Sequence, residues 1–259
     1  LSIVSEKSKA EVAAALWIAL QKGFILPISQ TYKAFQDEDA HNTYSQQNTE
    51  YRFLHDRCQQ AAYLLIEDEH KASTHWKIGN LLWQGWSESS QEKIFELVNQ
   101  LNLGKSVIDQ SVQKIDQKKQ LAQLNLQAAQ KARLSAAYSA VQTYCEIGIS
   151  LLPANAWETD YDLAYPLYYH GSEAAYLSGD FEAAEALYDV VLPHAKTPLD
   201  KAAIYRIQMT QYHFQGRNSE AIAIQRQSSQ LLGWTIPTEP EDIQAHLDAE
   251  IAAVNKFLE

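Results

Sequence analysis

Gly179-Asp180-Phe181-Glu182-Ala183-Ala184 decides the fold, because the same pattern returns as Gly216-Arg217-Asn218-Ser219-Glu220-Ala221. The leading glycine and the final alanine are both displaced by 37 residues. A glycine suits the tight turn between two helices, and a small alanine five residues later lets those helices approach closely. The repeat therefore predicts stacked helical hairpins in this part of the chain.

Hairpins with this turn resemble tetratricopeptide repeats, in which each unit is a pair of antiparallel helices. The residues around Tyr144 and Pro153 fit the same template loosely. The units are spaced by about 37 to 44 residues, against about 34 in the ideal repeat. We therefore expect a mainly α fold, with an irregular tetratricopeptide-like solenoid over residues 67–259.

The composition also favours helices. Of 259 residues, 46% are apolar, and only 9 are Gly and 7 are Pro. A β-sandwich or barrel of this length needs more Gly and Pro turn signals, and a nucleotide-binding α/β domain needs a glycine-rich phosphate loop. The composition therefore excludes these classes.

The first 66 residues contain the strand signals. A Ser8–Glu11 capping box begins a helix. Phe24–Ile28 and Tyr51–Leu54 then have the pattern of two strands, joined by a long polar tip that includes residues 36–50. A further helix follows the second strand. The order helix, strand, long loop, strand, helix is that of the second half of a winged-helix domain. We expect a partial winged helix with one β-hairpin over residues 1–66.

A second capping box, Thr238–Glu241, predicts a final helix near the end of the chain. Its apolar positions repeat with helical spacing, and we expect them to close the stack: Ile243, Leu247, Ile251, Val254 and Leu258.

Charge is distributed unevenly in this chain, whose formal net charge is −11. Residues 134–259 carry six basic and 17 acidic side chains, and such a surface repels phosphate backbones, so we expect no nucleic-acid partner. Residues 104–133 are basic instead. We interpret them as a solvated helix face, or alternatively as a docking surface for an acidic partner or another copy: Lys114, Lys118, Lys119, Lys131 and Arg133.

Several motifs are missing from the sequence. No apolar run approaches the roughly 20 residues of a membrane span, and no signal peptide is evident, so we expect a cytoplasmic protein without a membrane partner.

Cys58 and Cys145 cannot form a disulfide framework, and His70 and His75 are five residues apart, so they do not share a helical face. We expect no metal, no cofactor and no catalytic residue in this segment. The chain does not begin with Met, which suggests a piece of a longer protein.

His55 and Asp56 are the first candidate functional residues. They lie where the second strand meets the next helix, and the free N–H groups of a helix start favour an anion. An imidazole there adds one donor to a phosphate oxygen. The alternative is that His55 packs beside the hairpin and Asp56 caps a helix that extends to about Ile66.

An aromatic run is the second candidate. Helical spacing places its members on one face, where a concave groove would accept a small ligand or a peptide. The alternative is that helical repeats bury aromatic residues where their helices cross. The run comprises Trp157, Tyr161, Tyr165, Tyr168, Tyr169 and Tyr176.

Beyond these motifs, blocks covering nearly the whole chain resemble the region after the ATPase core in cyanobacterial multi-sensor signal transduction kinases. Those chains join a serine/threonine kinase, a STAND-type AAA ATPase, a helical-repeat arm, a GAF domain and a sensor histidine kinase, as in a two-component system. The blocks are Leu16–Pro27, Phe53–Tyr63, His75–Leu82, Ile94–Asn102, Gln123–Asn125, Gly148–Trp157 and Ala174–Glu182.

The resemblance implies a role for Leu54-His55-Asp56. In STAND ATPases a hydrophobic-His-Asp motif of the winged helix contacts the β-phosphate of bound ADP, and this stretch matches it. ATP, ADP and Mg would belong to the parent chain, whose ATPase and kinase domains would be partners of this segment. The segment has no P-loop, so alone it is expected neither to bind nor to hydrolyse ATP.

We therefore expect a non-catalytic regulatory or sensor arm that couples binding of a protein or small-molecule effector to the nucleotide state. The alternative is a stand-alone tetratricopeptide-like adaptor that binds a small ligand or a protein. A third possibility, an unrecognised enzyme, would need clustered titratable groups in a cleft.

Overall fold

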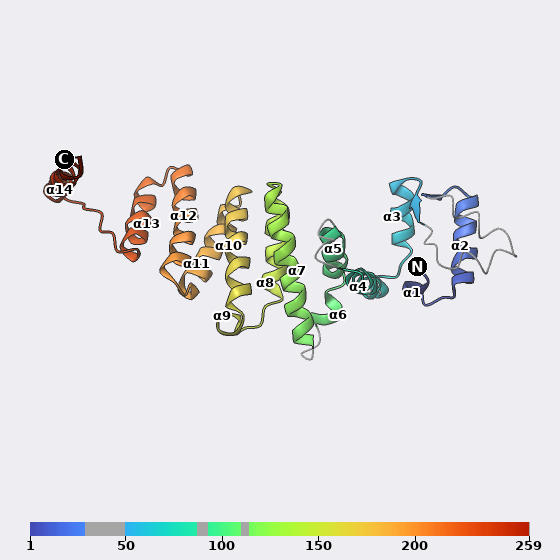
Figure 1. Ribbon diagram of the computed structural model, residues 1–259. Helices are drawn as coiled ribbons and strands as arrows, with labels where there is room; N and C mark the ends of the chain where they lie inside the picture. The colour runs from blue at the N-terminus through green and yellow to red at the C-terminus, as the bar shows by residue number, and fades with distance from the viewer. Residues whose placement is uncertain (29–49, 87–92, 110–113, 259) are drawn as a thin grey trace. The chain divides into compact units, whose positions relative to one another are not determined.

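The computed structural model describes residues 1–28, 50–86, 93–109 and 114–258, which form mainly helices, as the sequence predicts (Figure 1). The chain divides into two compact units, Leu1–Val112 and Gln113–Glu259. This division does not coincide with the expected boundary after residue 66, because helix α4 (Asp68–Gln84) packs on the first helix and on α5, all within the first unit.

The first unit begins with α1 (Ser2–Ser5) and α2 (Lys9–Gln21). The predicted capping box forms at α2, where Glu11 N–H donates to Ser8 Oγ at 3.2 Å and Ser8 N–H donates to Glu11 Oε2 at 2.9 Å. Strands β1 (Ile25–Pro27) and β2 (Tyr51–Phe53) pair antiparallel, with Leu26 opposite Arg52. The predicted hairpin is thus present, while its tip falls, except for residue 50, outside the described residues.

Helix α3 (Asp56–Leu64) follows the hairpin. The expectation that Asp56 caps it is wrong: His55 is the N-cap residue, with extended backbone, and Asp56 is the first helical residue. The His55 carbonyl accepts from the N–H groups of Cys58 and Gln59, and so starts the helix through its backbone alone.

The core of the first unit lies between α4, α5 (Ile94–Leu103) and α6 (Ser106–Asp109). Two glycines permit the close crossing: a Cβ on Gly79 would lie 2.5 Å from Leu101 Cδ2, and one on Gly104 would lie 2.6 Å from the Trp76 nitrogen. The apolar residues that recur at helical spacing along α5 are all buried, namely Ile94, Leu97, Val98 and Leu101.

The second unit is a series of helical hairpins, visible in Figure 1 from green to orange. Helix α7 (Ile115–Leu134) pairs with α8 (Tyr138–Ser150), α10 (Tyr161–Leu177) with α11 (Phe181–His194), and α12 (Pro198–Phe214) with α13 (Asn218–Leu231). A short helix, α9 (Ala156–Thr159), precedes α10. Helix α10 also packs on α7, α8 and α12, which joins the hairpins.

The repeated turns confirm the pattern that the sequence predicts. Gly179 and Gly216 have φ of +83° and +74°, and each follows a helix whose end is closed by the same backbone bond, Asp180 N to Ala175 O and Arg217 N to Tyr212 O. This is a Schellman motif. The α7–α8 turn has the same bond, from Ala137 N to Ala132 O, with Ala136 at φ +52° in the glycine position. In all three hairpins the residue five positions after the turn is buried, namely Val141, Ala184 and Ala221.

Helix α14 (Pro240–Leu258) differs from the expectation in two respects. It begins at Pro240, and the Thr238 hydroxyl donates to Glu239 Oε1 rather than closing the predicted capping box. Its apolar side chains from Ile243 to Val254 are 48% to 54% exposed, so this face does not close the stack. None of the described helices is long and apolar enough to cross a membrane.

Candidate functional site

The strand-to-helix junction presents its functional candidates to solvent. His55, Asp56 and Arg57 are all exposed. The backbone N–H groups of Asp56 and Arg57 have no partner among the described residues, as expected for the first turn of a helix. An open hollow of about 420 Å³ runs along α3 and is lined by Asp56, Gln59, Gln60 and Tyr63. The junction therefore offers N–H donors and an imidazole to an approaching group.

Exposed apolar side chains lie beside this junction. Phe24 and Leu54 are neighbours across the hairpin, because Leu54 N–H donates to the Phe24 carbonyl at 3.0 Å, and they are 51% and 43% exposed. Phe53 and Ile28 are exposed as well. We call Phe24, Ile28, Phe53 and Leu54 the hairpin patch. Among the described residues of 1–66, only Ile25 is buried, so this segment has almost no core of its own.

The predicted aromatic run lies between α10 and its neighbours. Trp157 of α9 stacks on His194 of α11, with ring centroids 4.6 Å apart, and contacts Tyr168 at 4.9 Å. Tyr165 and Tyr176 pack against the buried cluster around Tyr188. Burial raises the pKa of the phenols of Tyr165 and Tyr168.

Three tyrosines of the run form a stacked ladder whose hydroxyl groups all have partners within the chain. Tyr161 donates to Asp200 Oδ2 at 2.8 Å, and Tyr165 donates to the Asp200 carbonyl at 2.9 Å. Tyr169 accepts from Arg206 Nη2 at 3.0 Å. The chain's own groups thus engage the polar ends of this ladder, an arrangement that favours the packing interpretation over a ligand groove.

One member of the predicted basic stretch takes part in a cluster across three helices. Arg133, near the end of α7, donates through Nε to Glu173 Oε2 on α10 at 2.8 Å. Arg206 of α12 approaches the other oxygen of the same carboxylate at 3.5 Å. Beside them, burial and then the charge of Arg133 lower the pKa of His170, whose Nδ1 has no hydrogen-bond partner among the described residues. Sequence patterns do not reveal this cluster, since Arg133 and Glu173 are 40 residues apart.

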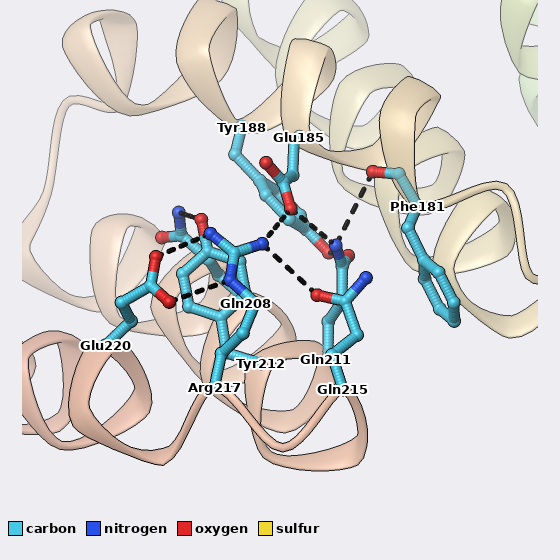
Figure 2. Close-up of polar contacts among 9 residues, drawn as sticks. All are labelled: Phe181, Glu185, Tyr188, Gln208, Gln211, Tyr212, Gln215, Arg217 and Glu220. Atoms are coloured by element: carbon cyan, nitrogen blue, oxygen red, sulfur yellow. Dashed lines mark hydrogen bonds and ion pairs between the residues drawn. The ribbon is translucent and has the colours of Figure 1, made fainter.

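A second polar network fixes the last hairpin, as Figure 2 shows. Arg217 pairs with Glu220 and with Glu185 of α11 at 2.6 Å each, and its guanidinium lies 3.9 Å from the ring centroid of Tyr212. The fully buried Tyr188 donates to Gln211 Oε1 at 3.0 Å. The hydrogen bond from Arg217 lowers the pKa of Glu220. These contacts join α11, α12 and α13.

The remaining histidine and lysine candidates have ordinary surroundings. His75 lies between Tyr63 Oη at 3.1 Å and Gln100 Oε1 at 2.7 Å, so it links α4 to α3 and α5. His70 lies with Glu67 and Glu69 on an exposed surface, where acidic groups are common. Lys119 forms an ion pair with Asp160, which lowers the pKa of that carboxyl.

Comparison with curated proteins finds a similarity to a signal transduction protein. The chain matches no model of a known protein family, and no solved structure matches it. It is 27% identical over 198 residues to hybrid signal transduction histidine kinase G of Dictyostelium discoideum. The aligned stretch covers 66% of this chain and 6% of that protein. The chain is therefore similar to one segment of a much longer protein that carries a signal transduction name.

Proposed function

We propose that the chain is a non-catalytic regulatory arm of a signalling protein. In this proposal residues 1–66, which contain the β-hairpin and are called the hairpin segment below, dock on a neighbouring nucleotide-binding domain of the same polypeptide. In this proposal His55 contacts the nucleotide phosphate held by that domain, and the helical hairpins connect the contact to an effector. ATP or ADP and Mg bind the neighbouring domain, and this chain performs no chemistry itself.

The observation that carries the proposal is the combination of an exposed His55 with the hairpin patch. Apolar side chains that are half exposed, in a segment whose described residues include one buried side chain, indicate a surface that another domain covers. The adjacent α3 start supplies unpaired N–H groups, which suit a phosphate. The similarity to a signal transduction histidine kinase supports the signalling role.

The helical hairpins suit transmission of a signal from an effector. The two helices of each hairpin are joined by the same closed turn, and α10 packs on α7, α8 and α12. The Arg217 network then ties α11 to α13 (Figure 2). Because packed helices move as bodies rather than deform continuously, a displacement of one hairpin shifts its neighbours. We propose that this series of hairpins passes an effector's signal toward the hairpin segment.

The direct test is the release of a fluorescent ADP analogue from the full-length protein. Loss of one hydrogen bond from His55 to a phosphate oxygen is expected to speed release about tenfold in the His55→Ala variant. His55→Gln keeps a donor and should restore part of the slow release. His246→Ala changes another exposed histidine, on α14, and is expected to leave the rate unchanged.

Two results would contradict the proposal. One is an ADP release rate in His55→Ala that equals that of the unmodified protein. The other is a full-length protein that binds no adenine nucleotide.

A further inference from the structure

The cluster of Arg133, Glu173 and Arg206 carries more positive charge than its own contacts neutralise. The Glu173 side chain is 13% exposed, whereas Arg133 and Arg206 are 44% and 57% exposed. One carboxylate faces two guanidinium groups that stay charged at any physiological pH. A single positive charge is therefore left at the surface where α7, α10 and α12 meet.

Both arginines also retain unused hydrogen-bond donors. In the described part of the chain, Arg133 donates only through Nε, to Glu173. Arg206 uses only Nη2, which donates to Tyr169 Oη and approaches Glu173. A guanidinium has five N–H donors in a planar fork. Each of the two guanidinium groups thus keeps further N–H donors that no described residue engages.

We propose that these three residues form a binding site for a phosphorylated segment of a partner protein. The inference rests on the proposed function and deepens it, because it names the class of effector that the arm receives. A phosphoryl group carries nearly two negative charges on three acceptor oxygens, and arginine pairs are suited to such a group. Glu173 holds both guanidinium groups in position before the partner arrives.

The charge of the rest of the chain favours a compact anion over an extended acidic segment. Residues 134–259 carry six basic and 17 acidic side chains, which repel a run of carboxylates at long range. Short charge-assisted hydrogen bonds act only at contact and escape most of this repulsion. The same net charge disfavours nucleic acid and anionic membranes.

A purely structural ion pair would not need the second arginine. Arg133 alone satisfies one oxygen of Glu173 at 2.8 Å, and a second guanidinium adds repulsion between like charges. That repulsion is relieved when an external anion sits between the two groups. The cluster therefore has the composition of an anion site that Glu173 occupies in part.

The test is a peptide titration of the 259-residue chain, followed by NMR of the arginine Nε–H signals. Arg133→Lys and Arg206→Lys assign the two signals. The probes are three peptides of one sequence, with phosphoserine, glutamate or serine at the centre. We expect saturable shifts of both signals with the phosphopeptide, about tenfold weaker binding of the glutamate peptide, and none of the serine peptide.

Variants separate binding from folding. Arg206→Gln is expected to weaken phosphopeptide binding about tenfold, while Arg226→Gln, an exposed arginine on α13, leaves it unchanged. Helical circular dichroism and the unfolding midpoint are measured for each variant. If Arg206→Gln does not fold, the titration of the unmodified chain decides alone.

The proposal is overturned by an absence of saturable shifts, by equal binding of the glutamate or serine peptide, or by unchanged binding in a folded Arg206→Gln variant. None of these results affects the proposed docking of the hairpin segment, because the titration does not involve residues 1–66.

Discussion

Ala136 is one of two non-glycine residues, with Glu6, that have a positive φ in the described part of the chain. It occupies the turn position that glycine holds at Gly179 and Gly216, with φ of +52°. A residue with a Cβ loses about 1–2 kcal/mol in this left-handed conformation. The α7–α8 hairpin was therefore harder to recognise from sequence, because its turn lacks the glycine that marks the other two hairpins.

We predict that Ala136→Gly stabilises the chain. Relief of the left-handed strain exceeds the roughly 0.4–1 kcal/mol that glycine adds to the entropy of the unfolded chain. The expected gain is about 0.5–1 kcal/mol, read from the urea midpoint followed by circular dichroism. Gly179→Ala is the matched opposite change, because a Cβ there meets no atom within 4 Å and only the backbone conformation is at issue. It should lower the midpoint, and a lower midpoint for Ala136→Gly would refute the argument.

A second prediction concerns the buried hydroxyl of Tyr188. Tyr188→Phe keeps the ring but removes the donor to Gln211 Oε1, in a place where both residues are fully buried. An unsatisfied buried acceptor costs about 1–3 kcal/mol, so unfolding should become easier by that amount. Tyr205→Phe is the control, since the Tyr205 hydroxyl has no hydrogen-bond partner among the described residues, and its cost should be below about 0.5 kcal/mol. Equal losses in the two variants would show that the network contributes nothing of its own.

At the scale of elements, one of the two predicted capping boxes forms. Ser8 and Glu11 form the predicted box at α2. At Thr238 the box fails, because Pro240 takes the first helical position that its fixed φ suits, and Thr238 is left outside the helix. A further capping box, formed by Thr197 and Asp200 with Pro198 directly after the cap, was not predicted.

Contacts between elements were the least predictable part of the candidate sites. The spacing of apolar residues predicted the hairpins and their buried positions, because each depends on residues within one helix or one turn. The partners of Tyr161, Arg133 and Arg217 lie on other helices, at Asp200, Glu173 and Glu185. No local pattern encodes which helices become neighbours, so the tyrosine ladder, the Glu173 cluster and the Arg217 network required the structure.

At the scale of the whole molecule, residues 1–66 and the second unit differ in how much apolar surface they bury. Helices α7 to α12 enclose fully buried side chains such as Leu121, Leu167 and Ile204, whereas the described part of residues 1–66 buries only Ile25. Apolar burial is the main driving force of folding, so the hairpin segment needs an additional surface to be stable. This contrast is the physical basis for assigning docking to the first segment and effector binding to the second unit.

The most direct test of this assignment is site-specific photo-cross-linking in the full-length protein. A photoreactive phenylalanine analogue is placed at Leu54 in the hairpin patch or, as a control, at Leu134, which is 87% exposed at the end of α7. We predict that the probe at Leu54 cross-links to a nucleotide-binding domain of the same polypeptide, more efficiently with ADP present, and that the probe at Leu134 does not. A probe at Leu54 that cross-links no more than the one at Leu134, with or without ADP, would contradict the account.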